Sequence, residues 1–149
     1  MSARRFHRVL VGWDSSPGAA AALAAAAGIA DDEVGRVVAL AVLRPIPHGE
    51  GGEEERTAEM ARHRHQAEKT FATARDTLPG ASRTRVTLEF AEGADAARAL
   101  CEYADAHVFE LLVLGRHGNG GILHPRLGHV AEAVAKKSDL PLLLLGSHI

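Results

Sequence analysis

The sequence predicts a doubly wound α/β fold, in which one five-stranded parallel sheet lies between two helical layers, as in Rossmann-like three-layer sandwiches. Short apolar runs alternate with longer helical segments along the whole chain. Most of these runs are apolar at consecutive positions, as expected of strands that are buried on both faces. Strictly alternating strands and helices imply parallel pairing through right-handed crossovers, and such crossovers place helices on both faces.

The first predicted strand and helix occupy residues 9–14 and 19–29. The strand is apolar on both faces and ends in turn residues. Ser16 supplies an N-cap and Pro17 a preformed first helical turn, and the alanine-rich stretch after them has high helix propensity. Close packing on the sheet explains these alanines, so we assign them no chemical role.

The second strand and helix are predicted between residue 37 and about residue 78. The apolar run 37–43 reads as a buried strand, and Pro45 ends it because proline cannot donate to a β-ladder. A glycine-rich stretch follows. Glu53–Glu55 then place acids where the dipole of a helix N-terminus favours them. This helix is expected to run to about Leu78, where a Pro-Gly pair closes it.

Three more strands and two helices are expected in the second half of the chain. Residues 85–90 alternate like a less buried strand and lead into a helix at 95–106. Residues 108–114 form an apolar strand, and a glycine-rich loop connects it to a helix starting near Gly128. The last strand, at 140–145, is almost wholly apolar. A proline near its start favours a strand with a free edge.

Length and composition indicate one domain spanning residues 1–149. The formal net charge of -2 gives no field that would draw the chain onto nucleic acid. Cys101 is the only cysteine, which excludes an intramolecular disulfide and fits a reducing compartment. The chain lacks an apolar stretch of the roughly 20 residues that a membrane helix needs, and its start does not read as a signal peptide. We therefore expect a cytoplasmic protein with no membrane or nucleic-acid partner.

Two glycine-rich segments mark the candidate site. Ligands of open α/β sheets bind beyond the carboxyl ends of the strands, where the strand order reverses. Residues 12–16 follow the first strand, and residues 115–121 follow the fourth, with Gly128 opening the next helix. Glycines let backbone N–H groups approach an anion, and a helix N-terminus adds partial positive charge. A backbone-held phosphate is favoured, and a merely flexible loop is the alternative.

Neither common phosphate-binding fingerprint applies to these segments. The loop has no Walker lysine, and its glycines do not follow the first strand as a dinucleotide fingerprint requires. The two segments instead resemble the universal stress protein family, and the resemblance extends across nearly the whole chain. Residues 9–17 are similar to the family's apolar strand and Gly-x-Asp-Gly-Ser, with Ser15 where glycine is common. Gly115, Gly118 and Gly128 have the spacing of the nucleotide-binding branch.

The resemblance implies the strand order 3-2-1-4-5, a homodimer formed through the C-terminal strand, and a regulatory or protective role in stress. It also implies binding of ATP or another adenine nucleotide, with or without Mg²⁺, between the first and fourth strands. Protein partners are not specified by it. The residues that the resemblance places around the nucleotide are Gly12, Trp13, Asp14, Val42, Leu114, Gly115, Gly118, Gly128, His129, Val130 and Ala131.

The chain departs from the family's motif at two positions. His129 stands where a Ser or Thr is expected after the last glycine, and Ala131 where a second hydroxyl is common. A hydrogen bond to a charged group is worth about 1.5–3 kcal/mol, so two missing donors weaken nucleotide binding. A nucleotide-independent interaction module of the same family is therefore the alternative. No catalytic constellation is identified, so we expect no enzyme activity.

The remaining polar candidates have ordinary explanations. His63 and His65 are two positions apart on a helix and do not share a face, so no metal site is expected. Cys101 is expected to be a buried, inert thiol. Trp13 either contacts the ligand or packs under the first helix. Charged residues that flank the glycine loop either steer phosphate or are simply solvated, and they are Arg116, His117, His124 and Arg126.

Overall fold

The computed structural model describes residues 5–46, 52–116 and 128–146. Its sheet has five strands in the order β3-β2-β1-β4-β5, and all four neighbouring pairs are parallel. This architecture confirms the predicted fold class and strand order. The strands are β1 (Arg8–Trp13), β2 (Arg36–Leu43), β3 (Val86–Glu92), β4 (Leu111–Gly115) and β5 (Leu142–Leu145).

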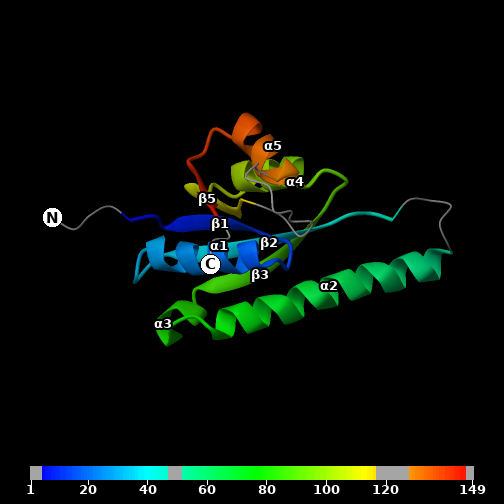
Figure 1. The fold of residues 1–149 in the computed structure, drawn as a ribbon, viewed down its shortest axis with the longest axis horizontal. Helices are drawn as coiled ribbons and strands as arrows, with labels where there is room; N and C mark the ends of the chain where they lie inside the picture. The colour runs from blue at the N-terminus through cyan, green and yellow to red at the C-terminus, as the bar shows by residue number, and fades with distance from the viewer. Residues whose placement is uncertain (1–4, 47–51, 117–127, 147–149) are drawn as a thin grey trace.

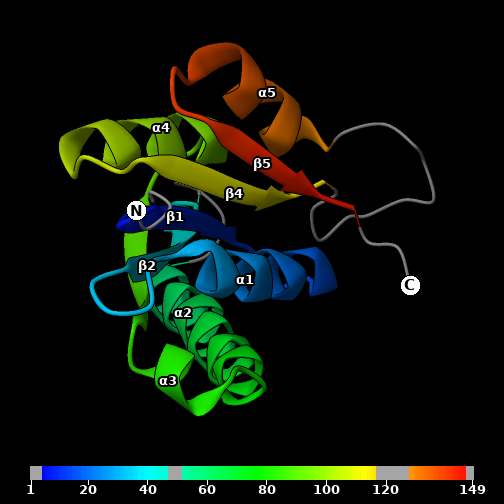
Figure 2. The ribbon, with the colours of Figure 1, turned by 90° about the vertical axis from the view of Figure 1, so that its left-hand side faces the viewer.

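Helices cover both faces of this sheet. Figure 2 shows α4 and α5 on one side of the strands, with α1 and α2 on the other. Each side encloses its own hydrophobic cluster, as a three-layer sandwich requires. The helices are α1 (Pro17–Ile29), α2 (Glu53–Asp76), α3 (Gly80–Arg83), α4 (Ala96–Ala106) and α5 (His129–Lys137).

The central strand β1 shows why consecutive apolar residues are needed. Val9, Val11 and Trp13 belong to the cluster under α1 and α2, which we call the α1/α2 cluster. Leu10 belongs to the opposite cluster under α4 and α5, which we call the α4/α5 cluster. Val9, Leu10 and Val11 have no exposed surface. Burial on both faces is therefore achieved by alternating side chains in one short strand.

Three elements differ from the prediction, and one of them is the last strand, which begins at Leu142 and not at residue 140. The fourth strand begins at Leu111 and not at residue 108, because Val108 has φ 54° and turns the chain after α4. Val108 is also 73% exposed, so its apolar side chain is not part of the sheet. The sequence also gave no indication of the short helix α3, which follows the proline that closes α2.

Helix α2 extends well past the body of the protein (Figure 1). Only Ala67 and Phe71 are buried among its 24 residues, and both lie in its C-terminal half. The N-terminal half is polar and mostly exposed. Although α2 is long, no helix of the described residues combines the length and apolar character needed to span a bilayer.

Candidate functional site at the ends of β1 and β4

Three polar residues form the turn after β1. Asp14 is exposed, and its Oδ1 accepts the N–H of Ser16 at 3.0 Å. Ser16 is buried and caps α1, accepting the N–H of Ala19 at 3.0 Å, as predicted. Ser15 between them has φ 65°, a left-handed conformation that favours glycine. The turn is therefore stabilised by the local hydrogen bonds of Asp14 and Ser16.

Gly115 ends β4 where the strand passes very close to α1. A Cβ on Gly115 would lie 2.9–3.1 Å from backbone atoms of Gly18. Backbone cannot move aside as a flexible side chain can, so only glycine fits at this crossing. The ends of β1 and β4 and the start of α1 thus form one tightly packed corner.

The base of the glycine loop is closed by backbone hydrogen bonds. The N–H of Gly128 donates to the carbonyl of Arg116 at 2.7 Å, and the N–H of Arg116 donates to the carbonyl of Leu145 at 2.7 Å. These bonds place the start of α5 beside the end of β4. The intervening residues, including the predicted site residues Gly118, His117, His124 and Arg126, lie outside the described part of the chain.

The predicted phosphate-facing residues at the start of α5 differ in how exposed they are. Gly128 is the N-cap residue and provides no side-chain cap. His129 and Val130 are exposed, whereas Ala131 is 3% exposed and belongs to the α4/α5 cluster. The methyl group of Ala131 is therefore committed to packing, and only its backbone N–H could serve an anion.

The other expected ligand residues lie nearer the core. Gly12 is half-buried, and a Cβ there would lie 2.4 Å from Cδ2 of Leu114. The Leu114 side chain thus fills the space above Gly12 and belongs to the α4/α5 cluster. Val42 is half-buried near the end of β2 and packs against the same cluster.

Trp13 lies on the opposite face of the sheet from Leu114. It is 5% exposed and meets Phe71 of α2 edge to face, with ring centroids 5.7 Å apart. Among the described residues, its buried Nε1–H has no hydrogen-bond partner. Of the two predicted roles, packing is the one that this placement favours.

The polar residues that were set aside have ordinary surroundings. His63 and His65 are exposed on α2, and the described residues contain no cluster of His, Cys, Asp and Glu that could hold a metal ion. Cys101 is half-buried, less than expected. Burial, followed by the nearby Asp105 carboxylate, raises the pKa of its thiol, which disfavours the reactive thiolate.

Sequence reasoning overlooked Thr70. Its hydroxyl on α2 lies 2.7 Å from the hydroxyl oxygen of Ser15, so α2 is joined directly to the turn beside Asp14. The serine at the position where the family commonly carries glycine was the available signal, because it marks a backbone conformation that needs compensation. The contact between α2 and this turn could not be read from spacing.

The fold and this corner define an α/β protein of the doubly wound class, with a glycine-rich turn and a helix N-terminus at the carboxyl ends of its central strands. The family model of the universal stress protein family matches residues 5–146. The chain therefore belongs to the universal stress protein family. A comparison with curated proteins gave no significant match.

Solved structures agree on the fold. Universal stress protein UspA from Lactobacillus plantarum has a TM-score of 0.83 at 20% identity, with 96% of this chain and 99% of that chain covered. A universal stress protein solved in complex with cAMP has a TM-score of 0.71 at 24% identity, with 97% and 100% covered. A universal stress protein from Archaeoglobus fulgidus has a TM-score of 0.65 at 18% identity, with 94% and 93% covered.

Proposed function

We propose that this chain is a cytoplasmic regulatory or protective protein of the stress response, a single domain that binds an adenine nucleotide between the ends of β1 and β4. The observation that carries the proposal is the start of α5. Its N-cap Gly128 has no side chain to satisfy the first N–H groups, and backbone bonds hold it beside β4. Uncapped N–H groups and the helix dipole favour a phosphate there.

The nucleotide class rests on two further points. The turn after β1 brings the Asp14 carboxylate to the same carboxyl-terminal end of the strands, where it could accept hydrogen bonds from ribose hydroxyls. A structural neighbour was solved in complex with cAMP, an adenine nucleotide. We propose ATP or another adenine nucleotide as the ligand, with Mg²⁺ bound through the phosphates if at all.

Calorimetric titration with ATP, AMP and cAMP tests this function. We expect micromolar or weaker binding, because backbone donors are present but the motif hydroxyl is replaced by His129. His129→Ser should tighten ATP binding about tenfold, since one hydrogen bond to a charged group is worth about 1.5–3 kcal/mol. Ala131 is left unchanged because its side chain is buried.

His63→Ser is the matched control, since His63 is also exposed but lies on α2. It should leave the titration unchanged. Absence of binding by both the wild type and His129→Ser, with no nucleotide co-purified by mass spectrometry, would reject the nucleotide site.

The second candidate is a nucleotide-independent interaction module. It is favoured by the Leu114 side chain, which fills the space above Gly12 where the adenosine is expected. The same titrations separate the two candidates. A module of this kind would bind no nucleotide, and His129→Ser would not create binding.

We further propose that the protein is not an enzyme. Glu110 accepts the N–H groups of His7 and Arg8 at the amino-terminal ends of β1 and β4, the opposite end of these strands from the glycine turn, so it is remote from a bound phosphate. Glu132 is the other acid to examine, and it pairs with Lys136 on the surface of α5. Hydrolysis of ATP that survives stringent purification would contradict this proposal.

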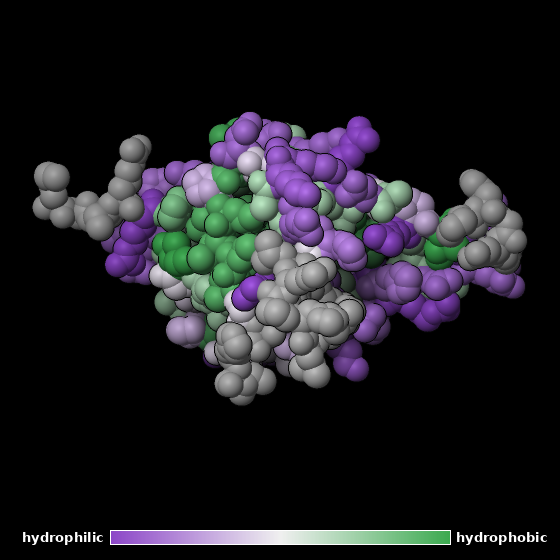
Figure 3. Space-filling view, turned by 45° about the horizontal axis from the view of Figure 1, so that its top comes forward, coloured by the Kyte–Doolittle hydropathy of each residue, from purple (hydrophilic) through white to green (hydrophobic). Residues whose placement is uncertain are grey.

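We also propose a homodimer through β5. This strand lies at the edge of the sheet, and Leu142–Leu145 are all half-exposed in the monomer. Figure 3 shows a hydrophobic area on the side where β5 lies. An apolar strand with a free edge invites antiparallel pairing with the same strand of a second copy.

Light scattering on the wild type tests the dimer, and a monomer at micromolar concentration would exclude it. Leu143→Asp and Leu144→Lys should reduce the mass to that of a monomer. Both leucines also pack against the core clusters, so circular dichroism must show that each variant is folded. A folded variant that is still dimeric would place the interface elsewhere.

A further inference from the structure

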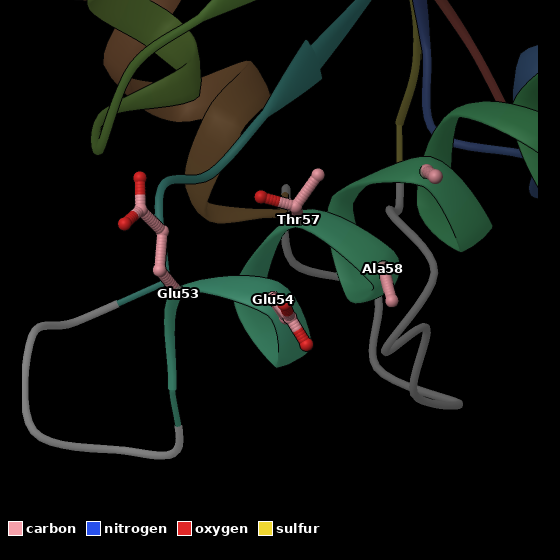
Figure 4. A pocket seen from close by; sticks show the side chains of 5 residues that line it. Glu53, Glu54, Thr57 and Ala58 are labelled. Carbon is pink, nitrogen blue, oxygen red and sulfur yellow. The ribbon is translucent and has the colours of Figure 1, made fainter.

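Along one exposed face of the projecting half of α2, acidic, small and basic residues follow one another in order. Figure 4 shows the side chains that line an open hollow along the start of the helix, which are those of Glu53, Glu54, Thr57, Ala58 and Ala61. All five residues are exposed. Acids therefore occupy the first turn of this face, and small side chains follow them.

The same face becomes basic one turn further along. Arg64 and His65 lie three and four positions after Ala61, the spacing that keeps side chains on one helix face. Both are exposed. The Arg64 guanidinium also stacks over the Phe90 ring of β3 at 4.2 Å, which fixes where this basic end lies relative to the sheet. The face thus runs from acidic through small to basic over residues 53–65.

We propose that this face of α2 binds the same face of a second copy of the chain, with the two helices antiparallel. A two-fold axis beside the small residues would set Glu53 near Arg64 of the partner subunit on one flank of the face, and Glu54 near the partner's His65 on the other flank. Thr57 would then lie opposite the partner's Ala61, and small side chains there allow the helix axes to approach closely.

The charge pattern of this face is complementary to itself, which is why we propose a second copy of the chain as its partner. Reversing the direction of this face exchanges its acidic and basic ends, so each copy supplies what the other requires. Glu68 is the next residue of the face, and in this register it falls beyond the first residue of the partner's helix. It therefore meets no acid of the partner's helix.

The projection of α2 makes the pairing sterically reasonable. Residues 53–65 extend over roughly 18 Å at 1.5 Å per residue, and Figure 1 shows this half reaching past the sheet. Two such segments can overlap side by side while the two sheets stay at opposite ends of the pair. Exposed ion pairs are weak and screened by salt, so the association should be weak and favoured by low ionic strength.

Charge reversal tests the pairing in the full-length protein. Glu53→Lys with Glu54→Lys makes the face wholly basic, and Arg64→Glu with His65→Glu makes it wholly acidic. Each double variant should lose the salt-sensitive part of the association that the wild type shows in sedimentation. An equimolar mixture should recover it, because a basic face then meets an acidic one at both ends.

Pairing through β5 is the same in the wild type and in both double variants, so it cannot produce this recovery. A wild type without salt-sensitive association, or a mixture that sediments like its separate components, would overturn the proposal.

Disulfide trapping gives a second readout that does not alter the charged residues. Thr57→Cys protein and Ala61→Cys protein, each also carrying Cys101→Ser, are mixed in equal amounts. They should form an intermolecular disulfide with each other at least several-fold faster than Gln66→Cys protein in the same background forms one with itself. Gln66 is equally exposed but lies on the opposite side of α2. Equal rates for all three positions would show random collision and contradict the pairing.

Discussion

Thr70 of α2 and Ser15 of the β1–α1 turn place their hydroxyl oxygens 2.7 Å apart, 55 residues apart in the sequence. Ser15 holds φ 65°, a conformation that costs an L-residue roughly 1–2 kcal/mol. The hydrogen bond offsets part of this cost. It also explains how serine is accommodated at a position where the family commonly has glycine.

A double-mutant cycle measures this compensation. Ser15→Gly relieves the backbone strain but loses the hydrogen bond, so the two changes of about 1 kcal/mol nearly cancel in the wild type. In a Thr70→Val background the hydrogen bond is already absent, and Ser15→Gly should stabilise the protein by about 1 kcal/mol in urea denaturation. Identical effects in both backgrounds would show that the two hydroxyls are not coupled.

Two glycine substitutions should change stability in opposite directions. Gly115→Ala forces a methyl group against the backbone of Gly18, and such overpacking costs about 1–3 kcal/mol. Gly28→Ala is the matched control, because Gly28 is exposed in α1 and a Cβ there meets nothing within 4 Å. It should stabilise the protein by about 0.5–1 kcal/mol through the helix backbone. Chemical denaturation measures both, and a neutral Gly115→Ala would contradict the close crossing.

The edge-to-face contact between Phe71 and Trp13 makes the single tryptophan a reporter of α2. Phe71→Ala should destabilise the protein by about 3–5 kcal/mol and shift the Trp13 emission to longer wavelength, because water reaches the indole. Thr73→Ala, at an exposed position of the same helix, should change stability by no more than about 0.5 kcal/mol. Unshifted emission in a folded Phe71→Ala protein would mean that α2 does not shield Trp13.

Stability should fall in acid partly through Asp95. The N–H of Arg98 donates to this N-cap carboxylate, and the nearby Lys137 ammonium pairs with it, so the pKa of Asp95 lies below its usual 3.8. A lowered folded pKa gives stability that is fully present above the unfolded pKa and is lost as pH falls through the folded value. The melting temperature of the wild type should therefore drop more steeply below pH 3.8 than that of Asp95→Asn.

Asp95→Asn retains an oxygen that can accept from Arg98 but removes the titrating charge. Its melting temperature should lie below that of the wild type at neutral pH, and the difference should shrink in acid. A difference that is constant across the whole pH range would show that Asp95 does not contribute through its ionisation.

Apolar runs and helix-start residues were sufficient to predict the fold class because they reflect local, strong constraints, whereas the strand order followed from the family resemblance. Ser16 caps α1 and Asp95 caps α4 through their own side chains, close to the expected boundaries. Val108 misled the strand prediction because its apolar character suggested a strand, whereas the turn after α4 places it in the left-handed region. Hydropathy alone does not report backbone conformation.

The candidate site was less predictable than the fold. Sequence spacing identified Gly115 and Gly128, but it could not show that Gly115 is needed for contact with Gly18 or that Gly128 donates to Arg116. It also grouped His129 and Ala131 together, although one is exposed and the other buried. Helix positions two apart lie on nearly opposite sides, and the packing partner of α5 decides which side faces inward.

The central position of β1 has a consequence for folding during synthesis. Its partner β2 is the next strand to be made, whereas its other neighbour β4 is not complete until Gly115. Arg8 and Glu110, joined by a hydrogen bond at the start of these two strands, are 102 residues apart. At about 5–20 residues per second, one edge of the central strand β1 therefore stays open for several seconds. Pairing of strands so far apart in the sequence is intrinsically slow, and it leaves the unpaired edge exposed to aggregation during synthesis.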